Sequence, residues 1–242
     1  MHPLTDSDIV GVWERGMANQ PVYRALILLA FACSEMTPEM LARLTIGQRD
    51  SLLLELRELA FGSQFSCLAH CPGCGEHLDL AFDAGEIRAV SAKDQSKTLS
   101  VRALGFEVLF RLPNSLDLVA IGGCKDVPAA RSLLLDRCLL SIKMDGKETT
   151  GLPLEVADLV VKRMEEVDPQ ADIQLSLSCP CCSQKWNQTF DIVYFLWSEI
   201  DFWARRILEE VHVLAMTYGW SEGEILAMTH QRRRIYREMA NK

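Results

Sequence analysis

The sequence predicts an α+β protein in which helices pack around two β-hairpins, with a long helix in its C-terminal part. Apolar residues recur every three or four positions before residue 62 and again after residue 191, which is the period of one face of a helix. Between these stretches, apolar and polar residues alternate over residues 78–82 and 173–177, as in half-buried strands. Each alternating stretch has a pair of cysteines next to it in the sequence. These cysteine pairs predict that the two hairpins meet at a shared site.

Residues 1–62 are expected to form an N-terminal helical region. Pro21 suits the first position of a helix, and the run from there to Ala32 is apolar on nearly every side, which predicts a buried helix. Thr45 and Gln48 form a capping-box pattern before the next apolar stripe, and Gly62 is placed to end that helix.

Residues 63–190 are expected to form one domain of strands and inserted helices. Besides the two hairpins with cysteines, the pattern predicts a polar connection, a further hairpin around Gly105, a broken helical stretch and an amphipathic helix. These four segments cover residues 83–97, 98–112, 115–142 and 154–167 in that order.

Residues 191–242 are expected to form C-terminal helices, of which the first runs from about Asp191 to Tyr218. Gly219 terminates it, and Ser221 with Glu224 makes a capping box for a short helix that follows. One apolar stripe defines the long helix and consists of Leu196, Ile200, Trp203, Ile207, Val211, Leu214 and Tyr218.

A short internal repeat carries the cysteine pairs. The sequence Cys71-Pro72-Gly73-Cys74 matches Cys179-Pro180-Cys181-Cys182, and the match continues beyond the cysteines without a gap. The equivalent positions downstream are Leu78 and Trp186, Phe82 and Phe190, and Asp83 and Asp191. Each copy is therefore predicted to be a strand, a Cys-Pro-x-Cys turn (a knuckle) and a second strand.

The repeat predicts a structural zinc ion held by Cys71, Cys74, Cys179 and Cys182. Structural zinc takes a tetrahedral shell, often of thiolates alone, and the spacing within one turn lets both of its sulfurs reach the same ion. One hairpin supplies only half of that shell, so the two hairpins are expected to share one Zn²⁺. Four thiolates leave no position for a reactive water, which favours a structural role over metal catalysis.

Other interpretations of the cysteines remain open at this stage. Each pair could be a redox dithiol, although that motif normally starts a helix in a βαβ unit and here a strand-like segment follows. Cys181, Cys67 or His70 could replace a ligand, with the repeat register favouring Cys182 over Cys181. The cysteines at 33, 124 and 138 lie in apolar helical stretches and are expected in the core.

Composition excludes several classes of function. Acidic residues outnumber basic residues by 33 to 25, so an affinity of the whole protein for nucleic acid is not expected. No apolar run is long enough to cross a membrane, and residues 1–6 carry no signal-peptide pattern, so a cytoplasmic location is expected. The sequence contains none of the common phosphate-loop, nucleophile-elbow or zinc-protease motifs, and we expect no enzyme activity.

Two features near the C-terminal end have more than one interpretation. Near the C-terminal end, the sequence places a basic group of Arg232, Arg233, Arg234 and Arg237. These residues could contact nucleic acid or an acidic partner, but favourable charge near a helix C-terminus and a solvated tail explain them more simply. Aromatic residues are dense in the long helix, and core packing is the first explanation. Trp197 and Phe202 lie off its main stripe, however, which suits docking onto a partner or a second copy. The residues predicted to bind a partner are Trp197, Phe202, Trp203 and Trp220.

The chain resembles the T-even-type phage baseplate proteins, described as baseplate hub assembly chaperones and found also in phage-tail-like contractile injection systems. The resemblance lies in the stretch 44–62, the two knuckles, the segment 111–113 and, above all, residues 195–197 and 218–225. It covers most of the chain and is weakest over residues 84–104. It implies a non-enzymatic role in building a baseplate, with other baseplate or hub proteins as partners.

Together, the repeat and the resemblance predict a zinc-stabilised assembly or structural protein of a phage-tail-like contractile particle. The first alternative is a zinc-ribbon nucleic-acid-binding or regulatory module, which the basic C-terminal turn favours and the net charge of −8 opposes. The second alternative is a dithiol oxidoreductase, which would need free rather than metal-bound thiols.

Overall fold

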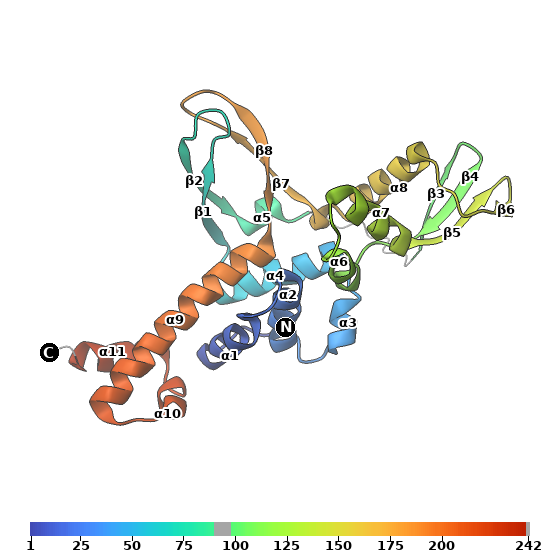
Figure 1. Cartoon of the computed structure of the whole chain (residues 1–242). Coiled ribbons are helices and arrows are strands. Elements are labelled where there is room, and N and C mark those ends of the chain that lie inside the picture. The colour runs from blue at the N-terminus through green and yellow to red at the C-terminus, as the bar shows by residue number, and fades with distance from the viewer. Residues whose placement is uncertain (90–97, 241–242) are drawn as a thin grey trace. The chain divides into compact units, whose positions relative to one another are not determined.

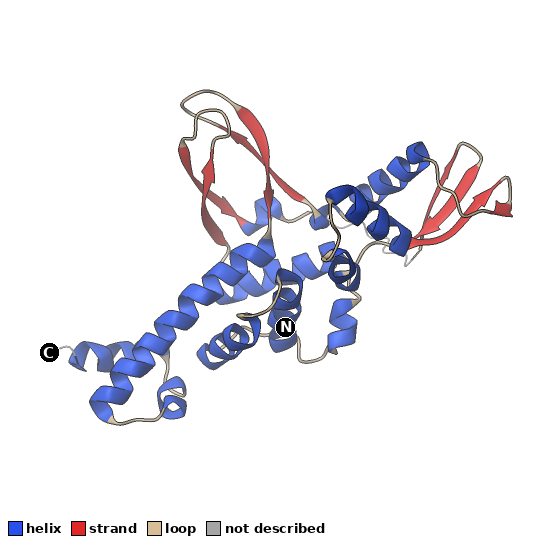
Figure 2. Cartoon of the chain, viewed as in Figure 1, coloured by secondary structure: helices blue, strands red, loops and turns tan. Residues whose placement is uncertain are grey.

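The computed structural model describes residues 1–89 and 98–240 and shows a mixed helix and sheet protein (Figures 1 and 2). Its helices are α1 (Asp6–Gly16), α2 (Pro21–Ala32), α3 (Pro38–Ala42), α4 (Ile46–Phe61), α5 (Ala84–Ile87), α6 (Ser115–Ile121), α7 (Val127–Cys138), α8 (Leu154–Val167), the 3-10 turn η1 (Pro169–Ala171), α9 (Ile192–Tyr218), α10 (Glu222–Leu226) and α11 (His230–Ala240). Its strands are β1 (Gln64–His70), β2 (His77–Asp83), β3 (Leu99–Ala103), β4 (Phe106–Phe110), β5 (Leu139–Met144), β6 (Lys147–Glu148), β7 (Ile173–Ser178) and β8 (Lys185–Phe190).

The described residues divide into two compact units. Unit 1 contains Met1–Glu35 together with the chain from Val193 onwards, and unit 2 contains Met36–Ile192. The three regions expected at 1–62, 63–190 and 191–242 stay a prediction, because compactness does not measure which parts fold independently. Within the described residues, no helix combines the length and apolar character that a membrane span requires.

Unit 1 is built on α9, the long helix that the apolar stripe predicts. Leu196, Ile200 and Leu214 are fully buried, and Ile207 and Val211 nearly so. The helix begins at Ile192 and ends before Gly219, as expected from the sequence.

A close approach sets how α1 packs against α9. A Cβ atom on Gly16 would lie 2.3 Å from the indole ring of Trp197, so only glycine permits this contact. The Trp13 indole N–H donates a hydrogen bond to Asp201 Oδ1 at 2.7 Å. The indole rings of Trp13 in α1 and Trp197 in α9 therefore both contribute to the packing of these two helices.

Arg233 departs from the solvated terminal helix expected from the sequence, because its side chain is fully buried. It donates to the Asp6 carboxylate, to Glu210 Oε2 at 3.3 Å and to the Met228 carbonyl oxygen at 2.8 Å. A buried guanidinium is tolerated only when its donors are paired in this way. Arg233 thereby ties α11 to both α9 and α1.

The other arginines of α11 also have partners within the chain. Arg237 lies 3.3 Å from Glu210, Arg234 lies 3.5 Å from Glu238, and the Arg232 guanidinium stacks 5.6 Å from the Tyr236 ring. Three of the four arginines are therefore paired with carboxylates of unit 1, which weakens the sequence argument for a nucleic-acid interface.

In unit 2, α8 packs on the sheet of order β3-β4-β5-β6. The core of this contact consists of Leu99, Val108, Phe110, Val156 and Val160. The hairpin predicted around Gly105 is present, with Leu104 and Gly105 at positive φ in its turn.

Two sequence-based assignments in unit 2 need revision. The helical stretch predicted for residues 115–142 ends at Cys138, because Leu139–Met144 pairs with β4 as strand β5. Long-range pairing of this kind overrides a local helical pattern. The polar connection predicted for residues 83–97 contains the short helix α5, and its part from residue 90 lies outside the described residues.

We predict that Arg233→Leu lowers the free energy of unfolding of the chain by about 3–5 kcal/mol, because it removes one of the two arginine partners of the buried Glu210 and the partner of Asp6. Arg234→Leu serves as the control, because the ion pair between Arg234 and Glu238 is exposed. This substitution should change the free energy of unfolding by less than about 1 kcal/mol. Urea denaturation followed by tryptophan fluorescence measures both values. Equal effects of the two substitutions would contradict a stabilising role for the buried network.

Candidate metal centre

Two antiparallel hairpins present the cysteine pairs. In β1–β2 the register runs from Gln64 opposite Asp83 to His70 opposite His77, and in β7–β8 from Ile173 opposite Phe190 to Ser178 opposite Lys185. Both hairpins therefore have the strand, knuckle and strand order that the repeat predicts, and Figure 1 shows them side by side with their turns together.

The two knuckles have the same backbone hydrogen bonds. The Cys71 N–H donates to the Glu76 carbonyl oxygen and the Gly75 N–H to the Cys71 carbonyl oxygen, both at 2.9 Å. At the equivalent positions of the second knuckle, Cys179 donates to Gln184 at 2.9 Å and Ser183 to Cys179 at 3.0 Å. The two copies are thus alike in backbone structure as well as in sequence.

A left-handed residue follows the second cysteine of each knuckle. Gly75 has φ of 76°, and Ser183, its equivalent, has φ of 61°. Glycine adopts this conformation without a steric penalty, whereas serine carries a Cβ that disfavours it. The first knuckle therefore has the less strained turn of the two.

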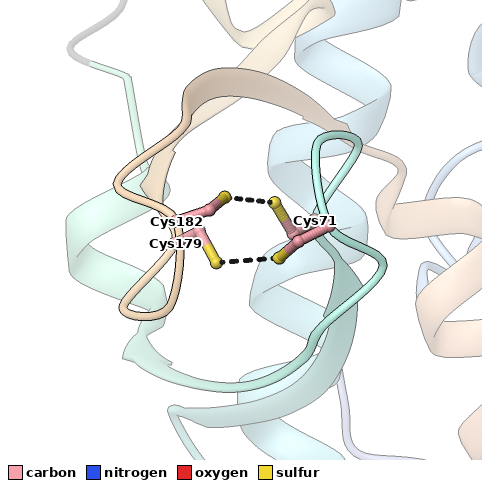
Figure 3. A group of neighbouring side chains, drawn as sticks. Cys71, Cys179 and Cys182 are labelled. Atoms are coloured by element: carbon pink, nitrogen blue, oxygen red, sulfur yellow. Dashed lines mark hydrogen bonds between the residues drawn. The ribbon is translucent and has the colours of Figure 1, made fainter.

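The knuckles bring four sulfur atoms together. The Sγ atoms of Cys71, Cys74, Cys179 and Cys182 all lie within 4.8 Å of one another. Cys71 Sγ lies 3.5 Å from Cys182 Sγ, and Cys74 Sγ lies 3.6 Å from Cys179 Sγ, so each close pair joins the two hairpins (Figure 3). Sulfur atoms bound tetrahedrally at about 2.3 Å from a zinc ion lie about 3.8 Å apart, so this group could hold a metal ion.

One side of the cysteine cluster faces protein and the other faces solvent. Cys71 and Cys179 are each 2% exposed and pack with Leu78, Leu80 and Trp186, whereas Cys74 and Cys182 are exposed. The first cysteine of each knuckle therefore anchors the cluster to the apolar interior of the hairpins.

The thiols of the cluster differ in acidity. Burial acts to raise the pKa of Cys71, but hydrogen bonds from the backbone N–H groups of Cys74 and Gly73 and from the neighbouring thiols lower it to about 7. At Cys74 the backbone N–H of Glu76 favours the thiolate, yet hydrogen bonds to Cys182 and Cys179 raise the pKa to about 12. Without a cation, one thiolate is thus stabilised by protonated neighbours, and a divalent cation would favour ionisation of all four.

An aromatic cluster joins the same hairpins at the ends of the strands opposite the knuckles. The Phe65 and Phe82 rings stack at 5.2 Å, and each meets the Phe190 ring edge-on at 5.6 Å. The Arg57 guanidinium, from α4, lies 4.0 Å from the Phe65 ring centre. The hairpins are therefore in contact at both ends.

The alternative ligands lie outside the four-sulfur group. Cys67 is half-buried opposite Leu80, and burial raises its pKa. Cys181 is exposed, and the negative charge of Glu76 is the main cause of its raised pKa. The His70 ring packs edge-on against His77 at 4.3 Å. The structure thus groups the four residues that the repeat selects.

The four aromatic residues predicted to bind a partner differ in exposure. Trp197 is 8% exposed and packs against Gly16. The Arg24 guanidinium lies 4.5 Å from the centre of the Trp197 ring. Trp220 is half-buried and stacks on Tyr218 at 4.5 Å. Phe202 is 55% exposed, and Trp203 beside it is half-buried. Of these four residues, Phe202 alone is exposed, and the other three are buried or half-buried.

We predict that Gly75→Ala lowers the free energy of unfolding of the hairpins by about 1 kcal/mol, because no atom crowds the new methyl group and only the left-handed backbone opposes it. Gly123→Ala, at an equally open site without a positive φ, is the control and should not destabilise unit 2. Thermal unfolding followed by circular dichroism compares them. Equal melting temperatures would show that the turn conformation carries no such constraint.

Comparison with known proteins identifies the family. The family model of the T4 bacteriophage base plate protein matches residues 23–197, which is more than half of the chain and includes both knuckles. No curated protein and no solved structure matches the chain. The resemblance seen in the sequence is therefore confirmed at the level of a T4-type baseplate protein, and the chain belongs to the T4 bacteriophage base plate protein family.

Proposed function

We propose that this chain is a non-enzymatic assembly or structural protein of a phage-tail-like contractile particle, stabilised by one structural zinc ion. The family match over residues 23–197 carries the first part of the proposal. A baseplate family supports partners that are other baseplate or hub proteins, and a place in the cytoplasm during assembly or in the particle itself. Within that family role, escorting hub components during assembly is the specific task that we propose.

The four-sulfur group supports zinc as the metal. Cys71, Cys74, Cys179 and Cys182 offer the all-thiolate donor set that is typical of structural zinc, and such a shell leaves no site for substrate or water. When bound, the ion would supply a closed tetrahedral cross-link. Its role would be to hold the two knuckles together, since each comes from a separate two-stranded sheet.

The gain from this cross-link follows from the size of the hairpins. An isolated two-stranded hairpin is marginally stable in water, and β1–β2 and β7–β8 have no further strand among the described residues. More than a hundred residues separate the two cysteine pairs, but the entropy of closing a loop grows only with the logarithm of its length. One ion could thus stabilise two elements that are weak alone.

The partner surface that we propose is centred on Phe202 and Trp203. Their rings lie 6.0 Å apart, and the Arg206 guanidinium lies 5.5 Å from the first and 5.1 Å from the second. Aromatic and arginine side chains are the types that most often dominate binding energy at protein interfaces. Trp197 and Trp220 would support this surface from within unit 1.

Metal content tests the zinc proposal. We predict one zinc per chain by elemental mass spectrometry of the purified protein. Cys71→Ser/Cys179→Ser should lose the zinc and unfold the hairpins, because one ligand is removed from each knuckle. Cys181→Ser is the matched control, since it changes a thiol in the same knuckle but outside the group, and it should keep both zinc and fold.

Two outcomes of the metal analysis would contradict the proposal. Freshly reduced protein without metal, and a double variant that stays folded, would show that the cysteines are not a structural site. Turnover of a disulfide substrate that is lost in the double variant would then assign them to redox chemistry.

Binding to co-expressed baseplate proteins tests the surface. We predict that Phe202→Ala weakens capture of a baseplate or hub partner at least tenfold, because an exposed aromatic anchor typically contributes about 2 kcal/mol or more. Met216→Ala removes an even more exposed apolar side chain (77% against 55%) from the same helix, outside the aromatic pair, and should leave capture unchanged. Equal capture by both variants would place the interface elsewhere.

A further inference from the structure

A hollow of about 600 Å³ lies between the two hairpins, on the side formed by β2 and β7. Its walls include residues 79–82, residues 172–177 and part of α5. The cysteine cluster and the phenylalanine cluster join the hairpins at their two ends, whereas Leu80, Leu175 and Leu177, between those ends, are only half-buried. The middle of the space between the hairpins is therefore incompletely filled.

The walls of the hollow are strand edges rather than strand faces. Side chains on one face of a strand alternate in sequence, so a face would contribute every second residue. Residues 79–82 and 173–177 contribute consecutively, which places the edge of each strand at the hollow. In the part of the chain that the structure describes, β2 pairs only with β1 and β7 only with β8, so both edges lack a neighbouring strand.

The charge of the described residues around the hollow is negative. Asp79, Glu86 and Asp172 line it, and none of these carboxylates has an ion pair with another described residue. Asp172 accepts only an uncharged hydrogen bond, from the Gln174 amide at 2.6 Å. The arginine at the wall, Arg88, is already paired with Glu58. A ligand that complements this hollow would bring positive charge.

We propose that the hollow between β2 and β7 binds an extended, basic segment of a partner protein by strand addition. An open edge supplies backbone hydrogen bonds to an added strand, and alternate side chains of that strand enter pockets beside it. Here the alternate apolar side chains would cover the half-buried leucines, and the basic ones would meet the carboxylates at the rim. The inference extends the proposed function, because a baseplate partner would have to supply the segment.

A synthetic peptide tests the site without the partner. The probe is a fluorescent seven-residue peptide that alternates lysine and valine, added to the full zinc-loaded chain at an ionic strength of about 0.15 M, where distant charges are screened. Fluorescence anisotropy should show saturable binding. A peptide with glutamate for lysine should bind at least tenfold more weakly, and so should a lysine peptide with alternate backbone nitrogens methylated, which cannot donate the strand hydrogen bonds.

Charge reversal locates the binding. Asp79→Lys/Asp172→Lys should weaken binding of the lysine peptide at least tenfold, because both residues line the hollow. Asp136→Lys, an exposed position on α7 outside these walls, should not. Circular dichroism and zinc content establish that each variant is folded.

Several results would overturn the inference. The lysine peptide could fail to bind, or the methylated peptide could bind as tightly as the unmethylated one. Alternatively, Asp136→Lys could weaken binding as much as Asp79→Lys/Asp172→Lys does. Concentration-dependent self-association that disappears in Asp79→Lys/Asp172→Lys would assign the hollow to a second copy of the chain instead. Each of these results leaves zinc content and capture of baseplate partners intact, so failure here is distinct from failure of the proposed function.

Discussion

The convergence of four cysteine sulfurs is the constraint on which the centre of unit 2 depends. Neither hairpin has a third strand among the described residues, and neither buries a full apolar face on its own. The sulfur atoms at the knuckles and the three phenylalanine rings at the opposite ends make them one element. Without a metal ion, the contact at the knuckles consists of thiol hydrogen bonds. A metal ion bound by the four sulfur atoms would strengthen this contact between the two hairpins.

The same constraint explains the hollow between the hairpins. Two sheets that are held at both ends, but that have two strands each in the described part of the chain, leave the space between their middles unfilled. In larger sandwiches, further strands cover the edges and complete the core. Here, among the described residues, the edges of β2 and β7 have no neighbouring strand and lie beside acidic side chains, and open edges are either protected or used for binding.

Charge plays a different part in unit 1. The arginines near the C-terminal end look like a basic patch in the sequence, yet Arg233 is buried and paired with Asp6 and Glu210. Because Asp6 lies in the first helix and Arg233 in the last, this pair links segments that are far apart in the chain. The charge of Arg233 is therefore paired inside unit 1 and does not contribute to a basic surface.

The sequence by itself determined the elements whose signals are local. The repeat located both knuckles and their flanking strands, and the apolar stripe located α9 to within a residue, because periodicity and spacing are properties of neighbouring residues. The grouping of the four cysteines also followed, since two identical half-sites are complete only together. The family resemblance supplied the baseplate context, which the family model then confirmed.

Only the tertiary structure decided the features that depend on distant partners. Leu139–Met144 becomes a strand because β4 lies beside it, Trp197 becomes a packing residue because Gly16 admits its ring, and Arg233 is buried because Asp6 and Glu210 meet it. The strand edges of β2 and β7 that have no neighbour among the described residues could not be predicted either, since a sequence pattern shows which residues form a strand but not which strands lack a neighbour. In each case the deciding contact joins residues that local periodicity cannot relate.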